Sequence, residues 1–329
     1  MGVSFPFFVD RLRTAVLGGT LAAGILFTSC AHFGAVPAEN RHAPGPHAAA
    51  INGASVSYHV HGKGPVCIVH PGGPGIKWDY VRMPALEKRL TLVYMEPVGS
   101  GASGQLPNAA DYTFERYAND IEGLRQHLGL ARFYLLGHSH GGMVAQVYAL
   151  KHQENLNGLI LLSTTPVTGK EWMDDLSANL GWFQKEPWFQ EALPAFMEIG
   201  TSKTSEEAAE HFKKAAGFYF ADYTANKEKI DAVMANIQVN LSPYRTFLAL
   251  PFDTRALLDR IHVPTLIVGG RKDPIIGLKF SKQIHDAIPG SRLAVLEKSG
   301  HMAHFDQPEE TAAAIGGFVN EAENSYAAK

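Results

Sequence analysis

The sequence is poor in cysteine and has no excess of charge of either sign. Only Cys30 and Cys67 are cysteines among 329 residues, which excludes a disulfide-stapled scaffold and a cysteine-rich zinc module. The 29 lysines and arginines nearly balance the 32 aspartates and glutamates, so the net charge of −3 gives no reason to expect nucleic-acid binding. Hydrophobic residues make up 46% of the chain and charged residues 19%, a composition that excludes a mostly disordered protein.

One common zinc motif and one common phosphate motif are also missing. The 15 histidines include no H-E-x-x-H pair, and no Gly-Lys-Ser/Thr sequence is present. His138 and His140 flank Ser139, but two histidines without a third nearby ligand make a poor metal site. We therefore expect neither a metal ion nor an organic cofactor.

The N-terminus has the features of an export signal. Arg11 and Arg13 precede the apolar stretch from Ala15 to Phe27, which is too short to span a hydrocarbon core of ~30 Å but fits the apolar part of a signal peptide. Thr28-Ser29-Cys30 follows and resembles a bacterial lipobox, in which small residues precede a cysteine that becomes lipidated. These features predict that residues 1–30 are a signal peptide of the lipoprotein type, that Cys30 carries the lipid and that the protein is exported to the cell envelope.

Two other fates of this segment remain open. An ordinary signal peptide, cut after Ala31 or near residues 36–38, gives a periplasmic or secreted protein, and an uncleaved segment acts as an anchor. Residues 31–50 are rich in Ala, Pro, Gly and His and predict a flexible tether. Membrane contact is expected only through the N-terminal lipid. Cys67 lies in an apolar run, which predicts a small buried hydrophobe.

The rest of the chain alternates between strand and helix patterns. Alternation predicts an edge strand at 55–61, and short apolar runs predict strands covered on both faces at 66–70, 90–95, 132–136, 159–162, 265–268 and 293–296. Helices are expected between them at 113–128, 143–151 and 279–288. This alternation predicts an α/β fold with a doubly wound, mostly parallel sheet, built from residues 51–166 and 253–329.

One segment, residues 167–252, lacks convincing strands. It is rich in aromatic residues and contains helical patterns at 205–216 and 225–237. We interpret it as an inserted helical cap that covers the carboxyl ends of the strands and closes a pocket there. The alternative is that its aromatic residues only form the core of the cap.

The strongest functional pattern is Gly137-His138-Ser139-His140-Gly141. It follows a predicted strand and opens a predicted helix, which is the context that a G-x-S-x-G nucleophile requires. Glycines are needed because the turn is too tight for side chains, and the helix N-terminus favours developing negative charge. We therefore predict that Ser139 is a catalytic nucleophile.

A serine nucleophile needs a base and an orienting acid, which follow the serine along the chain in this fold. Asp273 lies just beyond the strand at 265–268 and is the predicted acid. His301 lies in the loop after 293–296 and is the predicted base, with His304 as its competitor.

The oxyanion of an acyl-transfer intermediate requires two backbone N–H donors. One is expected from His140, the residue after the nucleophile. The other is expected from the glycine-rich loop after the strand at 66–70, with Gly73 as the first choice and Gly72 as the alternative.

Gly72-Gly73-Pro74-Gly75, the serine motif, Asp273 and Ser299-Gly300-His301 together resemble the proline iminopeptidase branch of the α/β-hydrolase superfamily, over about residues 50–325. The resemblance implies an α/β-hydrolase fold and an aminopeptidase that releases an N-terminal residue, often proline, from short peptides. Pro71 departs from the usual His-Gly-Gly-Pro-Gly, and Glu96-Pro97-Val98-Gly99 stands where the branch usually has Asp-Gln-Arg-Gly. The cap also lacks the Trp-x-x-Trp-Glu motif of the branch.

An aminopeptidase must hold a cationic amine, which requires a carboxylate near the substrate. The candidates are Glu186 and Glu191 in the cap and Glu96 at the end of a core strand, with Trp182 and Trp188 as aromatic neighbours. The alternative is that the cap glutamates are ordinary solvated residues. The same triad also serves a carboxylesterase, lactonase or amidase acting on a small acyl substrate, and a binding protein without catalytic activity is a third possibility.

Overall fold

The computed structural model describes residues 41–327. The predicted signal peptide, Cys30 and residues 31–40 of the predicted tether lie outside the described residues. For residues 45–50 the tether prediction is wrong, because Gly45–Ile51 forms the strand β1, which pairs with β2. Asn52 and Gly53 join the two strands with positive φ angles of 48° and 80°, as a tight two-residue hairpin turn requires.

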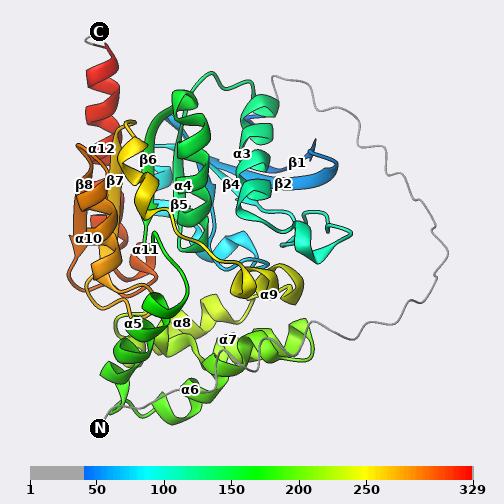
Figure 1. Cartoon of the computed structure of the whole chain (residues 1–329), viewed down its shortest axis with the longest axis vertical. Helices are drawn as coiled ribbons and strands as arrows, with labels where there is room; N and C mark the ends of the chain where they lie inside the picture. The colour runs from blue at the N-terminus through cyan, green and yellow to red at the C-terminus, as the bar shows by residue number, and fades with distance from the viewer. Residues whose placement is uncertain (1–40, 328–329) are drawn as a thin grey trace, which may run out of the picture.

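The core is an eight-stranded sheet with the order β1-β2-β4-β3-β5-β6-β7-β8 (Figure 1). The pairs β1–β2 and β2–β4 are antiparallel and the other pairs are parallel. Because β1 takes the edge, β2 is an inner strand and not the edge strand expected at 55–61. The remaining strands are β2 (Ala54–Gly62), β3 (Val66–His70), β4 (Thr91–Glu96), β5 (Phe133–His138), β6 (Leu156–Leu162), β7 (Thr265–Gly270) and β8 (Arg292–Leu296).

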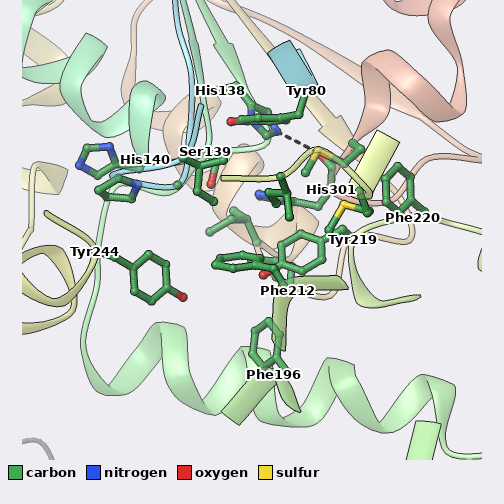
Figure 2. Close-up of a pocket in the computed structure, with 18 of the residues that line it drawn as sticks. Tyr80, His138, Ser139, His140, Phe196, Phe212, Tyr219, Phe220, Tyr244 and His301 are labelled. Atoms are coloured by element: carbon green, nitrogen blue, oxygen red, sulfur yellow. Dashed lines mark hydrogen bonds between the residues drawn. The ribbon is translucent and has the colours of Figure 1, made fainter. Parts of the chain in front are cut away.

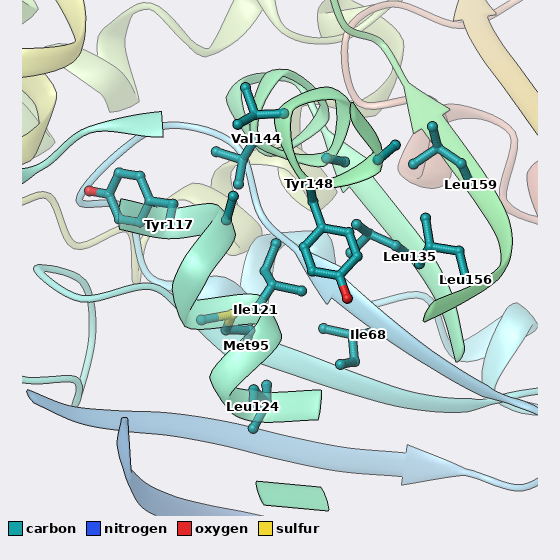
Figure 3. Packing of buried hydrophobic residues seen from close by; sticks show 14 of the residues in the cluster. Ile68, Met95, Tyr117, Ile121, Leu124, Leu135, Val144, Tyr148, Leu156 and Leu159 are labelled. Carbon is teal, nitrogen blue, oxygen red and sulfur yellow. The ribbon is translucent and has the colours of Figure 1, made fainter. Parts of the chain in front are cut away.

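Helices cover both faces of the sheet, and a buried cluster lies on each face. The first cluster packs α3 and α4 on one face, where Ile121, Leu124, Val144 and Tyr148 share a buried cluster with Leu135 of β5 (Figure 3). The second packs α2 and α12 on the other face and contains Cys67, which is fully buried as expected. The core helices are α2 (Pro84–Glu87), α3 (Phe114–Leu128), α4 (His140–His152), α10 (Leu278–Ala287), α11 (Ala303–Asp306) and α12 (Pro308–Ala327), with short 3-10 turns η2 (Trp78–Val81), η3 (Ala109–Asp111), η4 (Gln153–Asn155) and η8 (Arg255–Arg260).

The first and last residues of α3 follow from its sequence. Thr113 is the N-cap, and its hydroxyl accepts a hydrogen bond from Arg116 N at 3.1 Å. Gly129 ends the helix with φ 68°, a left-handed conformation that glycine adopts without strain. Tyr117, Ile121 and Leu124 form the buried face.

Between β6 and β7 the chain forms the helical segment that we call the cap. It contains α5 (Lys170–Leu180), α6 (Phe189–Glu198), α7 (Ser205–Lys214), α8 (Tyr223–Met234) and α9 (Leu241–Ala249), with η5 (Gly181–Phe183), η6 (Ile199–Thr201) and η7 (Ala216–Phe218). It has its own buried cluster, and Val167 forms a β-bridge with Asp253, so its two ends lie side by side. In Figure 1 the cap lies below the sheet, at the end where β5 meets α4. Among residues 41–327 no helix is both long and apolar enough to cross a membrane.

Candidate active site

Ser139 lies at the sharp turn between β5 and α4. Its φ and ψ angles are 55° and −120°, a strained conformation for a non-glycine residue. A side chain at Gly137 would collide with the carbonyl of Gly141, and one at Gly141 would collide with the carbonyl of His70. The two glycines of the motif are therefore required by packing, and the turn presents Ser139 above the carboxyl ends of the strands.

Asp273 and His301 lie on the loops after β7 and β8 and form a buried pair. His301 Nδ1 lies 2.9 Å from Asp273 Oδ2, and the two side chains are 3% and 0% exposed. The other oxygen of Asp273 accepts hydrogen bonds from Ile275 N and Ile276 N, both at 2.9 Å. These bonds stabilise the carboxylate and fix the direction in which it points at the imidazole.

The structure distinguishes His301 from its competitor His304. Both histidines line the same cavity as Ser139, and Figure 2 shows His301 and the serine in it. His304 Nε2 instead bonds the backbone carbonyl of Tyr80 at 2.9 Å, and burial lowers the pKa of His304 to about 4. Of these two histidines only His301 is paired with Asp273, and it lines the cavity together with Ser139.

Gly73 and His140, whose backbone N–H groups are the predicted oxyanion donors, line the cavity together with Ser139. Gly72 N donates to the hydroxyl of Tyr80 at 2.5 Å and is therefore already used. Among the hydrogen bonds of the described residues none starts from Gly73 N or His140 N, which leaves these two groups for a substrate oxygen. Gly73 has φ 61°, and a side chain there would collide with Ile76.

The cavity above Ser139 is closed by the cap and is almost entirely apolar. Figure 2 shows Phe212 on the cap side of Ser139 and Phe196 beyond it, farther from the serine. Its volume is about 100 Å³. Besides the residues of the serine turn and the histidines, the wall consists mainly of aromatic and aliphatic side chains: Ile76, Tyr80, Met143, Trp172, Phe196, Phe212, Tyr219, Phe220, Val233, Met234, Ile237, Tyr244, Phe247, Leu248, Ile275, Ile276, Met302 and Phe305.

No aspartate, glutamate, lysine or arginine of residues 41–327 is among the side chains that line this cavity. Three of the lining histidines, His138, His140 and His304, do not supply a charge in their place. Burial lowers the pKa of His138 and His140 well below the usual range and that of His304 to about 4. At neutral pH these three rings are therefore uncharged.

The predicted amine-binding glutamates do not line the cavity. Glu96 is buried at the end of β4, where its carboxylate contacts His59 Nε2 at 2.9 Å and accepts a hydrogen bond from Ala102 N. Glu186 accepts from the Thr224 hydroxyl at the surface, and Glu191 is 73% exposed. Glu96 is thus occupied by the sheet and its neighbouring loop, and the two cap glutamates face solvent.

The predicted aromatic neighbours are also elsewhere. Trp182 is 56% exposed at the surface of the cap. Trp188 packs against Phe183, Phe218 and Tyr223 inside the cap. The tryptophan of the cavity wall is Trp172, whose Nε1 donates to Ile275 O at 2.8 Å and so joins α5 to the loop after Asp273.

Sequence reasoning missed Tyr80 as a site residue. Tyr80 lies in η2, eight residues after Gly72, and contacts both Gly72 N and His138 Nδ1. No motif marks it, because a single tyrosine in a 3-10 turn carries no periodicity. His138 was noticed only as a neighbour of Ser139, although its ring links three loops of the site.

The described residues offer little to a metal or a nucleotide. In residues 41–327 there is no group of three or more His, Cys, Asp or Glu side chains that could hold a metal ion. Gly99, Gly101 and Gly104 have the spacing of a dinucleotide-binding turn, but a loop follows them and not a helix N-terminus that could bind a pyrophosphate.

Comparison with known proteins agrees with this geometry. The alpha/beta hydrolase fold family matches residues 65–308, so the chain belongs to that family. It is 27% identical to a proline iminopeptidase of Saccharolobus solfataricus over 80% of this chain and 87% of the relative. It is 28% identical to a 2-hydroxy-6-oxo-2,4-heptadienoate hydrolase of Pseudomonas putida over 78% of this chain and 89% of the relative. An esterase structure from Exiguobacterium antarcticum superposes with a TM-score of 0.62 at 25% identity, covering 82% of this chain and 97% of the esterase.

Proposed function

We propose that the protein is a serine hydrolase that cleaves esters of small, uncharged acyl groups. The observation that carries this proposal is the cavity wall, which has no carboxylate and no cationic side chain among the described residues. A charged substrate group buried against such a wall would lose its hydration without gaining a partner. An apolar acyl group gains free energy in the same place by leaving water.

The proposed reaction uses Ser139, His301 and Asp273 in the roles of a catalytic triad. Ser139 Oγ attacks the ester carbonyl while His301 Nε2 takes the hydroxyl proton, and Asp273 holds the Nδ1–H of the resulting imidazolium. The tetrahedral intermediate expels the alcohol, which receives that proton from His301. Water then attacks the acyl-serine by the same route and releases the acid. The negative oxygen of each intermediate is stabilised by the N–H groups of Gly73 and His140, the latter at the N-terminus of α4.

The size of the cavity favours a small acyl group. Its volume of about 100 Å³ is somewhat below the roughly 150 Å³ of an engineered apolar cavity that binds benzene. A short acyl chain or a single ring suits this space. A long fatty acyl chain does not fit unless the cap moves.

A second candidate is the aminopeptidase that the sequence resemblance implies. Similarity to proline iminopeptidases supports it, at 27% identity for the relative named above and 28% for one from Heyndrickxia coagulans. The residues proposed to hold the amine weaken it, because Glu186 and Glu191 face solvent and Glu96 is occupied by His59 and Ala102. On this alternative the substrate is a short peptide with a free N-terminal amine.

A substrate panel separates the two candidates. It contains p-nitrophenyl acetate, butyrate, benzoate and palmitate together with prolyl and alanyl p-nitroanilides, the latter with free and with acetylated amines. Ser139→Ala provides the background for each compound. We expect the short-chain and ring esters to be hydrolysed in preference to palmitate and to the anilides. Preferential cleavage of free-amine anilides, lost on acetylation, would establish the aminopeptidase instead, and no serine-dependent turnover of any compound would favour a binding protein.

A further inference from the structure

We propose that Tyr80 is a positioning residue of the active site, which uses one hydroxyl group to hold the oxyanion loop, the nucleophile turn and the loop of His301 in register. This inference rests on the proposed function, because it concerns how the oxyanion donors are selected. In this role Tyr80 transfers no proton and acts only through Gly72 and His138. Figure 2 shows Tyr80 beside His138, on the side of Ser139 away from the cap aromatics.

The first step is the protonation state of His138. The ring is buried, and burial lowers its pKa well below the usual range, so the imidazole is neutral and carries one N–H. Its Nε2 lies 3.1 Å from the backbone carbonyl oxygen of His301, which can only accept a hydrogen bond. Nε2 must therefore carry the hydrogen, and Nδ1 presents a lone pair.

The second step follows for the tyrosine hydroxyl. Tyr80 Oη lies 3.1 Å from His138 Nδ1, which is an acceptor in this tautomer, so the hydroxyl must donate to it. Burial raises the pKa of Tyr80, which keeps the hydroxyl protonated. The oxygen of Tyr80 is then free to accept, and it accepts from Gly72 N at 2.5 Å. In this series of hydrogen bonds every donor has one acceptor. The series runs from Gly72 N–H through Tyr80 and His138 to His301 O.

The third step concerns the backbone of Tyr80, which is itself fixed. His304 Nε2 donates to the carbonyl of Tyr80 at 2.9 Å from α11. The loop has little freedom near Gly72, because a side chain at that position would collide with Ser139 Cβ. A small movement of Gly72 would therefore displace the neighbouring Gly73 relative to the serine.

Tyr80 thereby determines which of two adjacent glycines can donate its N–H to a substrate oxygen. Two N–H groups of the loop, from Gly72 and Gly73, could serve a substrate oxygen on sequence grounds. Tyr80 occupies the first, so only Gly73 remains to act with His140. The same hydroxyl group reaches the His301 backbone through His138, and it thereby couples the position of the base to that of the oxyanion donors.

The test compares Tyr80→Phe with Tyr148→Phe. Both variants remove one hydrogen-bonded tyrosine hydroxyl, but Tyr148 is buried in the core outside the cavity, where its hydroxyl donates to Glu122 Oε2 at 2.9 Å. The readouts are kcat and KM for the best ester of the panel, the inhibition constant of a trifluoromethyl ketone that forms an oxyanion on the serine, and the rate at which a fluorophosphonate labels Ser139.

For Tyr80→Phe we expect kcat to fall about 10- to 100-fold, the range for a buried donor and acceptor left without their partner, with KM changed by less than about threefold. The ketone should bind more weakly by the factor by which kcat/KM falls, and labelling should slow similarly. Tyr148→Phe should change each quantity by less than about twofold. Equal effects of the two variants, or a change confined to KM, would overturn the proposal, because Tyr80 would then be only a part of the wall.

A nitrogen NMR measurement decides the network without any substrate. Histidine ring ¹⁵N spectra of the full chain at pH 7 should show His138 as the neutral Nε2–H tautomer. Tyr80→Phe should shift the Nδ1 resonance of His138, and Tyr148→Phe should not. If no ester is hydrolysed but this shift is found, the proposed substrate class fails and the network stands. If esters are hydrolysed but Tyr80→Phe does not shift the Nδ1 resonance of His138, the proposed network is wrong and the esterase proposal is supported.

Discussion

Asp306 joins the catalytic loop to the cap through the backbone of Ala221. Its Oδ2 accepts hydrogen bonds from Ala221 N at 3.0 Å and from Gly300 N, next to His301, at 2.7 Å. Met302 N also donates to Tyr219 O in the cap, at 3.0 Å. The loop that carries the base is thus joined to the roof of the cavity by a network of three hydrogen bonds, two of which depend on the carboxylate of Asp306.

Replacing Asp306 with asparagine should change how stability depends on pH. Burial raises the pKa of Asp306 to about 6, so the folded state binds its proton more tightly than the unfolded state, where the pKa is about 3.8. The ionised carboxylate therefore lowers the free energy of unfolding above pH 6. This destabilisation disappears as the pH falls from 6 towards 4. The wild type should gain about 1–3 kcal/mol in free energy of unfolding relative to Asp306→Asn between pH 7.5 and 4.5.

Urea unfolding of both proteins at the two pH values measures this difference. Asp306→Asn keeps an oxygen that can accept the two N–H bonds, so its activity at pH 7.5 should remain near that of the wild type. A difference in unfolding free energy that does not change with pH would show that Asp306 is not buried as a charge.

The far wall of the cavity should set the acyl length. Phe196 on α6 lies at the end of the cavity away from Ser139, so Phe196→Ala adds space where a longer acyl chain ends. We expect the ratio of kcat/KM for hexanoate over acetate to rise about 10-fold, since each additional buried CH₂ contributes about 0.8 kcal/mol. The control is Trp182→Ala, which changes a cap aromatic that is 56% exposed and should leave the ratio unchanged. An unchanged ratio in Phe196→Ala would mean that acyl groups bind elsewhere.

Neutralising the cap glutamates should have almost no effect on the proposed reaction. Glu186 and Glu191 face solvent and are absent from the cavity wall. Glu186→Gln and Glu191→Gln should therefore keep kcat/KM for esters within about twofold of the wild type, as is usual for surface substitutions. A marked rise of KM for a prolyl anilide in either variant would instead indicate that this glutamate holds a substrate amine.

Much of this architecture was predictable because it follows from local chemistry. The buried strands appear as short apolar runs since both faces of a parallel sheet are covered, and the Ser139 turn is recognisable since only glycines fit around it. β1 escaped prediction because its Ala, Pro, Gly and His composition suggested a tether. The Asn52-Gly53 pair, with both φ angles positive, was the available indication of a hairpin.

The cavity wall could not be predicted to the same degree. Helical periodicity shows that one face of a cap helix is apolar, but it does not show whether that face meets the cap core or the substrate. Trp188 and Trp172 illustrate this difference, since the first packs inside the cap and the second lines the cavity. Tyr80 acts through contacts with residues distant in sequence, which no local pattern reveals.

Export is proposed to depend on residues 1–30, which lie outside the described part of the chain. If Cys30 is the lipidated residue, the wild type should incorporate radiolabelled palmitate and sediment with membranes. Cys30→Ala should abolish the label and move the protein to the soluble fraction, because one acyl-modified cysteine is then the anchor. Cys67→Ala is the matched control, since Cys67 is buried in the core and should leave labelling unchanged. Wild-type protein without label would favour the secreted form.

The central claim, catalysis by Ser139, is tested most directly by measuring hydrolysis of p-nitrophenyl acetate by the wild type, Ser139→Ala and Ser163→Ala, with a fluorophosphonate labelling experiment on the same samples. Ser163 is a buried serine after β6 that does not line the cavity. We expect kcat to fall about 10⁴-fold or more in Ser139→Ala, with loss of the label, and Ser163→Ala to keep both. Hydrolysis and labelling that persist in Ser139→Ala would contradict the assignment of Ser139 as the nucleophile.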